Sequence, residues 1–219
     1  MKSKYKVLEL FAGSRSIGNA AEDLGCEVFS VDINDFKGID LVQDIEFLLP
    51  NQIPFIPDLI WASPPCTTYS IAAISKHRNN GKPKTDFAAK CDRLVINTLK
   101  LIKHYDCIYY IENPRGYLRK MYFMNGLPKA TVWYCQYGDQ KRAKPTDIWS
   151  NNIRSIFNHN GWQPRAECWN GRKNCHVLAP RGSKTGTQGL KGNYERSKIP
   201  SELCYEIIQS SLKNYEQKD

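Results

Sequence analysis

The sequence predicts an α/β fold with a mostly parallel sheet, to which a small basic segment is appended. Stretches of β-branched and aromatic residues alternate with stretches whose apolar residues recur at helical spacing. Glycine-containing or polar turns follow the strand-like stretches, and parallel sheets bind ligands at such turns. With 219 residues, the chain is long enough for one domain with a substantial core.

The first predicted unit is a strand, a glycine turn, a helix, a second strand and an acid. Residues 5–10 (YKVLEL) form the strand, Gly13 lies in the turn, and helical spacing continues to Gly25. Residues 26–31 form the second strand, which ends at Asp32. The turn offers backbone N–H groups, and the acid can accept hydrogen bonds from ribose hydroxyls. Because GxGxxG is absent, we predict a Rossmann-like nucleotide site without a pyrophosphate cradle.

The next strand leads to a candidate nucleophile. Residues 58–61 (DLIW) are short and apolar, and two prolines soon after them force the chain to turn. The turn delivers Cys66 beside several hydroxyl side chains. A thiol in a rigid loop at the end of a buried strand is suited to nucleophilic catalysis. The polar and basic residues 71–83 are expected to form a mobile, solvated loop that could close over a bound polyanion.

The rest of the chain continues the α/β pattern. Thr85 or Asp86 is expected to cap a helix that runs to about His104. The other predicted elements are strands over residues 106–111, 130–135 and 146–149 and a helix over residues 201–212. The first of these strands ends at Glu112, at the same predicted sheet edge as Cys66.

Composition limits the partners and the compartment. The formal charge of +9 and the pI near 9.1 favour a nucleic-acid partner. No apolar stretch approaches the roughly 20 residues of a membrane span, so we expect a soluble, cytoplasmic protein that does not bind membranes. Several of the eight cysteines lie inside apolar strand or helix patterns, which predicts reduced thiols rather than a disulfide framework.

Residues 151–192 differ from the rest in composition. They contain seven Lys or Arg residues against a single acid and are rich in Gly and Asn, as expected for a small binding segment. Cys168, Cys175 and His176 are candidate zinc ligands, with Cys135 and His159 as further donors to consider. No CxxC pair is present and the spacing is loose, so the sequence favours free cysteines in a small core over a metal.

Four motifs resemble those of DNA (cytosine-5)-methyltransferases, in the same order along the chain. LELFAGSRSIG is similar to the cofactor motif of that family, SPPC to its catalytic loop, Glu112-Asn113 to its Glu-Asn-Val, and QYGDQKRAKP to its Gln-x-Arg-x-Arg. In the last motif Gln140 and Arg142 match, and Lys144 replaces the second arginine. A lysine keeps the charge but loses the planar fork.

Two further departures concern the cofactor turn and the base pocket. Arg15 and Ser16 stand where the family carries two glycines, which affects the approach of the backbone to the cofactor. Pro114 replaces a valine, which affects the shape of the base pocket.

The resemblance implies the fold of S-adenosylmethionine-dependent methyltransferases. Residues 1–150 would be the catalytic domain, residues 151–192 a small target or DNA-binding segment much shorter than in the family, and residues 193–219 a helix that returns to the catalytic domain. The implied reaction transfers a methyl group from S-adenosylmethionine to carbon-5 of a cytosine flipped out of duplex DNA.

The resemblance also assigns the site residues. Cys66 would attack carbon-6, Glu112 would protonate N3, and Arg142 would stabilise charge near the thiolate and the O2 edge of the base. The residues implied to bind the cofactor are Leu10, Phe11, Ala12, Gly13, Ser14, Ser16, Ile17, Asp32, Ile33, Asp44, Ile45 and Pro64.

Three alternatives stay open on the sequence. An amino-methyltransferase has an Asn-Pro-Pro-Tyr-like loop after the same strand, but Cys66 replaces the aromatic residue. The same chemistry could act on RNA, on a free nucleotide or with a group other than methyl, although the basic charge disfavours a free nucleotide. A catalytically silent DNA-binding homologue would account for the departures at Arg15, Ser16 and Pro114.

Overall fold

A seven-stranded sheet forms the centre of the molecule in the computed structural model, which describes residues 4–138, 142–168, 176 and 193–216. In spatial order the strands are β3 (Leu41–Val42), β2 (Glu27–Asp32), β1 (Lys6–Leu10), β4 (Leu59–Ala62), β7 (Ile108–Pro114), β9 (Pro145–Ser150) and β8 (Lys129–Trp133). The first five run parallel, and β9 is antiparallel to both of its neighbours. The predicted mostly parallel α/β sheet is confirmed.

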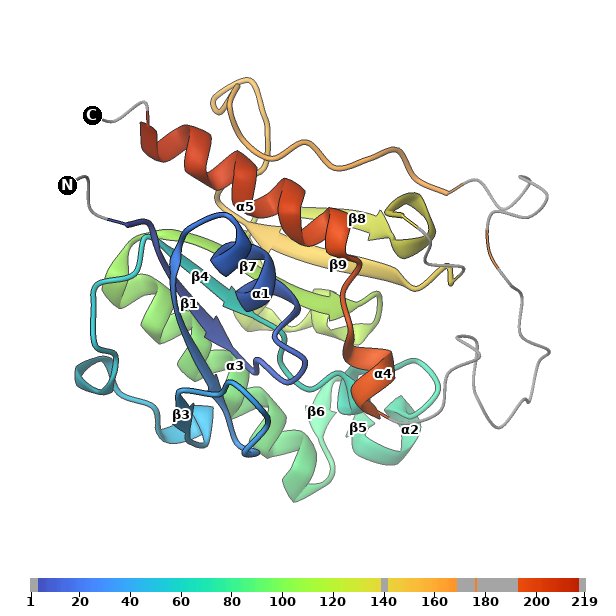
Figure 1. Ribbon diagram of the computed structural model, residues 1–219. Helices are drawn as coiled ribbons and strands as arrows, with labels where there is room; N and C mark the ends of the chain where they lie inside the picture. Colours follow the sequence, from blue (N-terminus) through green and yellow to red (C-terminus); the bar gives the residue numbers. More distant parts are fainter. Residues whose placement is uncertain (1–3, 139–141, 169–175, 177–192, 217–219) are drawn as a thin grey trace.

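Helices cover both faces of this sheet (Figure 1). The main ones are α1 (Ser16–Asp23), α3 (Asp86–Tyr105) and α5 (Ser201–Glu216). Side chains alternate along β1, so Leu8 and Leu10 enter the core beneath α3, whereas Val7 enters the core beneath α1 and α5. Both cores are therefore built from the same strands, and the carboxyl ends of the parallel strands meet at one edge.

The predicted helix boundaries agree closely with the structure. The Thr85 side chain accepts a hydrogen bond from the Ala88 N–H, which satisfies one of the unpaired donors at the start of α3. At the other end Asp106 adopts a left-handed conformation, with φ of 48°, and ends the helix.

The expectation of a mobile loop over residues 71–83 is wrong. These residues form a short helix and a two-stranded hairpin, namely α2 (Ile74–His77), β5 (Arg78–Asn79) and β6 (Lys82–Pro83). The physical reason is Arg78, whose side chain is buried and paired with Asp92 rather than solvated. The basic composition of the stretch concealed this buried ion pair.

The described part of the basic segment packs against the sheet and α5. After β9 the chain makes isolated bridges that pair Ile153 with Trp162 and Ser155 with Asn158. Trp162 is buried in the core shared with α5, and its ring meets the edge of Tyr110. Apart from His176, the rest of the predicted segment from residue 169 to 192 lies outside the described residues. None of the described helices has the length and hydropathy needed to cross a membrane.

Candidate active site

A buried guanidinium holds the loop that carries Cys66. Arg78 donates through Nε to the Thr68 carbonyl at 3.0 Å and through Nη2 to Asp92 Oδ1 at 2.6 Å. Its guanidinium carbon also lies 4.3 Å from the centre of the Tyr69 ring. A buried charge is costly without partners, so these contacts fix the turn directly after Cys66. Sequence reasoning missed Arg78, and no local pattern distinguishes it from its exposed basic neighbours.

Cys66 and Glu112 lie at the ends of neighbouring parallel strands. The register pairs Ala62 of β4 with Ile111 of β7, so the two strands reach the same edge of the sheet side by side. Asn113 strengthens this arrangement because its Nδ2 donates to the Pro64 carbonyl at 2.9 Å. The Asn113 side chain is fully buried, and its Oδ1 accepts no hydrogen bond from the described residues. The end of β7 is thereby tied to the SPPC loop.

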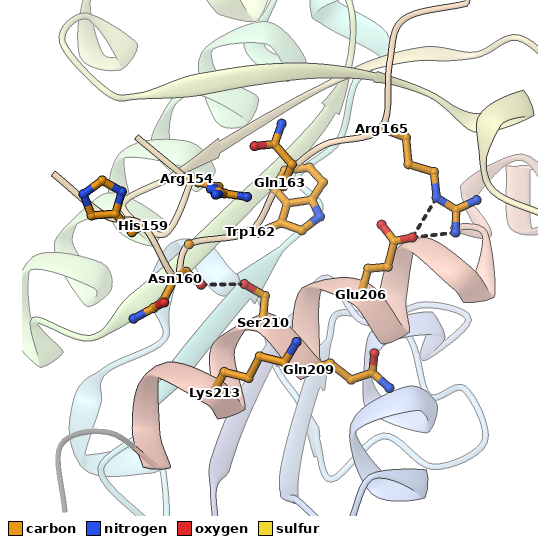
Figure 2. Close-up of a pocket in the computed structure, with 11 residues that line it drawn as sticks. Arg154, His159, Asn160, Trp162, Gln163, Arg165, Glu206, Gln209, Ser210 and Lys213 are labelled. Carbon is orange, nitrogen blue, oxygen red and sulfur yellow. Dashed lines mark hydrogen bonds and ion pairs between the residues drawn. The ribbon is translucent and has the colours of Figure 1, made fainter. Parts of the chain in front are cut away.

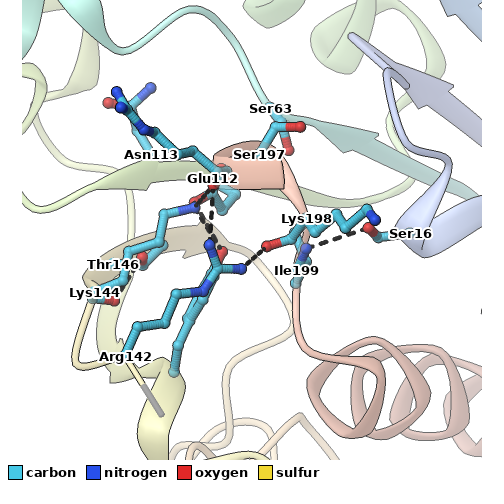
Figure 3. Close-up of polar contacts among 12 residues, drawn as sticks. Ser16, Ser63, Glu112, Asn113, Arg142, Lys144, Thr146, Ser197, Lys198 and Ile199 are labelled. Carbon is cyan, nitrogen blue, oxygen red and sulfur yellow. Dashed lines mark hydrogen bonds and ion pairs between the residues drawn. The ribbon is translucent and has the colours of Figure 1, made fainter. Parts of the chain in front are cut away.

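Glu112 shares its environment with a tyrosine and a lysine (Figure 3). The Tyr134 hydroxyl donates to Glu112 Oε1 at 3.1 Å, and the Lys144 ammonium lies 3.8 Å from the same oxygen. Glu112, Tyr134 and Lys144 are all buried. The ammonium also lies 4.5 Å from the centre of the Tyr134 ring. A carboxylate, a phenol and an ammonium are therefore held together away from bulk water.

The same charges act on the candidate nucleophile. Burial raises the pKa of the Cys66 thiol, the Glu112 carboxylate raises it further, and the Lys144 ammonium opposes both. Burial lowers the pKa of Lys144, and Glu112 opposes that change. Thiol, carboxyl and ammonium thus form one coupled set. Sequence reasoning noted Lys144 only as a weakened arginine, whereas the structure makes it the basic group that acts on Cys66.

Arg142 contacts the segment that leads into the C-terminal helix. Its guanidinium donates to the carbonyls of Glu195 at 3.3 Å and Arg196 at 3.4 Å, and to that of Lys198 (Figure 3). These carbonyls belong to α4 (Asn193–Ser197) and the residue after it. The role of Arg142 at a bound base stays a prediction, and Gln140 of the same motif lies outside the described residues.

The cofactor turn keeps a backbone shape that glycine normally provides. Gly13 and Arg15 both adopt left-handed conformations, with φ of 48° and 51°. Arg15 tolerates this because its guanidinium pairs with Glu22 at 2.5 Å and its Nε donates to Ser30 at 3.1 Å. The arginine that departs from the family pattern is therefore anchored on α1 and β2.

The C-terminal chain completes this turn. The Ile199 N–H donates to Ser16 Oγ at 3.2 Å, and Ser16 Oγ lies 2.9 Å from Ser14 Oγ (Figure 3). The residue just before the last helix therefore contacts the turn after β1. Next to it the Ile17 N–H donates to the buried Glu9 carboxylate.

The carboxyl end of β2 fits a nucleoside. Asp32 accepts a hydrogen bond from the Gly13 N–H at 3.0 Å, which ties the acid to the turn. The neighbouring Ile33 is 54% exposed, so its apolar side chain is open to a ligand. An acid for ribose hydroxyls beside an apolar surface for adenine matches the donor and acceptor set of S-adenosylmethionine. These residues would hold the cofactor.

The other predicted cofactor residues also have structural contacts or are buried within the protein. Asp44 pairs with Lys90 at 2.6 Å and caps a short helix through the Glu46 N–H. Phe11 lies in the turn with φ of 56°, at the end of β1. The remaining members share burial of their side chains: Leu10, Ala12, Ile17, Ile45 and Pro64. Their contacts with a cofactor stay predictions.

A separate pocket lies on the second half of α5 (Figure 2). It has a volume of about 440 Å³, and its walls include Arg154, His159, Trp162 and Lys213. No predicted catalytic or cofactor-binding residue lines it. The other end of α5, its N-terminus, follows Ile199, which contacts Ser16 in the turn after β1. This pocket is therefore distinct from the candidate active site.

Comparisons with known proteins agree with this architecture. No family model matches the chain. A probable DNA (cytosine-5)-methyltransferase of Frog virus 3 (isolate Goorha) is 27% identical over 225 residues, which cover 93% of this chain and 98% of the relative. Among solved structures, the Entamoeba histolytica methyltransferase EhMeth superposes with a TM-score of 0.52 at 15% identity, over 68% of this chain and 53% of that one. The S. pombe Dnmt2 methyltransferase gives 0.49 at 16% identity, over 72% and 54%. The chain thus spans about half the length of these two structures.

The sheet order and the likeness to EhMeth show a Rossmann-like fold of the kind found in that methyltransferase. Similarity to the viral relative extends over nearly the whole of both chains, and the four motifs lie in the family order. The chain is thus similar over nearly its whole length to a probable DNA (cytosine-5)-methyltransferase.

Proposed function

We propose that the chain methylates carbon-5 of cytosine in DNA through a covalent bond to Cys66. The observation that carries this proposal is the coupled set at one sheet edge, where the Lys144 ammonium lies 3.8 Å from the Glu112 carboxylate and both groups act, in opposite directions, on the pKa of the Cys66 thiol. Carbon-5 of cytosine is too weak a nucleophile to react alone. A thiol and a proton donor on opposite edges of the ring overcome this weakness.

The proposed steps assign one task to each side chain. The Cys66 thiolate forms a bond to carbon-6 while Glu112 gives a proton to N3, which makes carbon-5 electron-rich. S-adenosylmethionine, when bound, supplies the activated methyl group. After methylation the carbon-5 proton is lost to solvent, the bond from carbon-6 to sulfur breaks, and N3 returns its proton to Glu112. Lys144 favours the thiolate at the start and at the end of this cycle.

Two features support DNA as the substrate, and one requirement follows from it. The viral relative is named as a DNA (cytosine-5)-methyltransferase. The chain carries a formal charge of +9, which favours a polyanion. Neither face of a stacked cytosine is open to a thiol, so the proposed reaction requires the base to be flipped out of the duplex.

A covalent-trapping experiment tests the proposal. The full chain is mixed with S-adenosylmethionine and duplex DNA that carries 5-fluorocytosine in many sequence contexts, then resolved by denaturing electrophoresis. Fluorine at carbon-5 cannot leave as a proton would, so the adduct accumulates. We expect an adduct that requires the cofactor and is lost in Cys66→Ala. A matched control, Cys107→Ala, removes a half-buried thiol at the start of β7, and it should retain the adduct.

The possible failures separate the alternatives. An adduct with 5-fluorocytosine RNA but not with DNA would replace the proposed substrate by RNA. Methylation of unmodified DNA that survives Cys66→Ala would indicate amino-methylation. No adduct, together with no cofactor binding by calorimetry, would indicate a catalytically silent homologue.

A further inference from the structure

Two cysteines and a histidine converge beside the active site, where the basic segment meets the sheet. The Sγ atoms of Cys135 and Cys168 and a ring nitrogen of His176 all lie within 4.8 Å of one another. Cys168 Sγ is 3.7 Å from His176 Nδ1. From this cluster we propose that the protein binds a zinc ion through Cys135, Cys168 and His176.

The spacing of the donor atoms suits a tetrahedral metal. Zinc bonds of about 2.3 Å to sulfur and 2.0 Å to nitrogen, at tetrahedral angles, place a sulfur and a nitrogen ligand about 3.6 Å apart. The Cys168 to His176 separation of 3.7 Å agrees with this value. Two thiolates and an imidazole are borderline-soft donors, which select zinc over magnesium or calcium, and a water molecule would complete the tetrahedron.

Independent contacts bring the two cysteine-bearing stretches together. Cys135 lies in a short helix, η6 (Tyr134–Gln136), directly after β8. Three residues before Cys168, Arg165 donates from its backbone N–H to the Tyr137 hydroxyl at 2.9 Å and from its side chain to the Gln136 carbonyl at 2.7 Å. Arg165 is itself paired with two acids of α5. The meeting of Cys135 and Cys168 therefore does not depend on the metal alone.

A metal at this position would stabilise the packing of the segment after β9 on the rest of the fold. In the described residues 151–168 the large apolar side chains Ile156 and Phe157 are exposed, and Trp162 and Cys168 are buried, so this stretch buries little apolar surface. A structural zinc provides folding free energy where a core is small. The helix η6 begins with Tyr134, whose hydroxyl donates to Glu112. The same metal would therefore also hold in place one side of the candidate active site.

The metal content of the purified chain tests the proposal. The full chain is purified without chelators, its affinity tag is removed, and its metals are measured by inductively coupled plasma mass spectrometry. We expect about one zinc ion per chain and a loss of at least tenfold in Cys168→Ser and His176→Asn. The matched controls Cys107→Ser and His159→Asn, which remove the same donor types elsewhere, should keep their zinc.

A second measurement covers variants that do not fold. The unmodified chain is stripped of metal and titrated with Co²⁺ alone. Tetrahedral cobalt with thiolate ligands gives intense visible absorption and a thiolate-to-metal charge-transfer band, and we expect both to saturate at about one ion per chain. The proposal is overturned if the chain holds less than about a tenth of an equivalent of zinc and cobalt gives neither band. It is equally overturned if the Cys168 and His176 variants retain as much zinc as the controls.

Discussion

The carboxyl group of Glu9 should make the stability of this protein fall as pH rises through neutrality. Glu9 is 2% exposed at the start of the cofactor turn. Burial raises its pKa from the ordinary 4.5 to about 7, although the Ser30 hydroxyl and the Ile17 N–H donate to it and Arg15 lies near. Between these two pKa values the folded chain binds more protons than the unfolded chain, so deprotonation favours unfolding.

The magnitude follows from the size of this difference. One pKa unit corresponds to about 1.4 kcal/mol, so the ionised carboxylate costs about 3 kcal/mol of folding free energy well above pH 7. About 2.5 kcal/mol of this cost develops between pH 5 and pH 8. Glu9→Gln removes the ionisation while its amide can accept from the Ile17 N–H and donate to the Ser30 hydroxyl.

Urea unfolding followed by tryptophan fluorescence measures the effect. We expect the unfolding free energy of the unmodified chain, relative to Glu9→Gln, to fall by about 2 to 3 kcal/mol from pH 5 to pH 8. Glu27→Gln, which alters an exposed carboxylate at the start of β2, is the matched control and should show no such trend. A difference between the unmodified chain and Glu9→Gln that stays constant over this range, within about 0.5 kcal/mol, would refute the reasoning.

Three substitutions at the sheet edge give further expectations. Lys144→Met removes the charge that lowers the pKa of Cys66, so alkylation of Cys66 by iodoacetamide should require a higher pH than in the unmodified chain. An unchanged dependence of the alkylation rate on pH would contradict the coupling. Asn113→Ala removes the donor to the Pro64 carbonyl, so kcat should fall about 10- to 100-fold while calorimetry finds the cofactor affinity unchanged. Arg142→Ala removes the guanidinium that donates to the carbonyls of Glu195, Arg196 and Lys198, although Lys144 still donates to that of Arg196, and it should cost about 2 to 4 kcal/mol in urea unfolding, of which Arg142→Lys recovers only part. Equal stability of these two Arg142 variants would show that the planar guanidinium group of the arginine does not matter for stability.

The sequence was sufficient for those parts of the fold that depend on local pattern. The strands that flank the cofactor turn and the capping of α3 by Thr85 follow from periodicity and from short-range hydrogen bonds, and both agree with the structure. The meeting of Cys66 and Glu112 at one edge followed from the parallel order of their strands. In each case the signal lies within a few residues of the feature.

What sequence reasoning missed depends on distant partners. Arg78 looks like its exposed neighbours, because the acid that buries it lies in α3. The importance of Lys144 comes from Glu112, which is on another strand. Arg142 matched its motif, but its guanidinium donates to carbonyls as far along the chain as that of Lys198, more than fifty residues away. No single-sequence pattern carries such pairings.

The contact between Ile199 and Ser16 has a consequence for how the protein matures. These two residues are 183 positions apart, yet their hydrogen bond closes the cofactor turn. Ordering so large a loop carries an entropic cost that must be met before its contacts form, which slows the final step of folding. The N-terminal strands can pair early in synthesis, but the wall supplied by residues 195–199 arrives only with the last part of the chain. Catalytic competence should therefore appear after the sheet has formed, and activity would report completion of the whole fold.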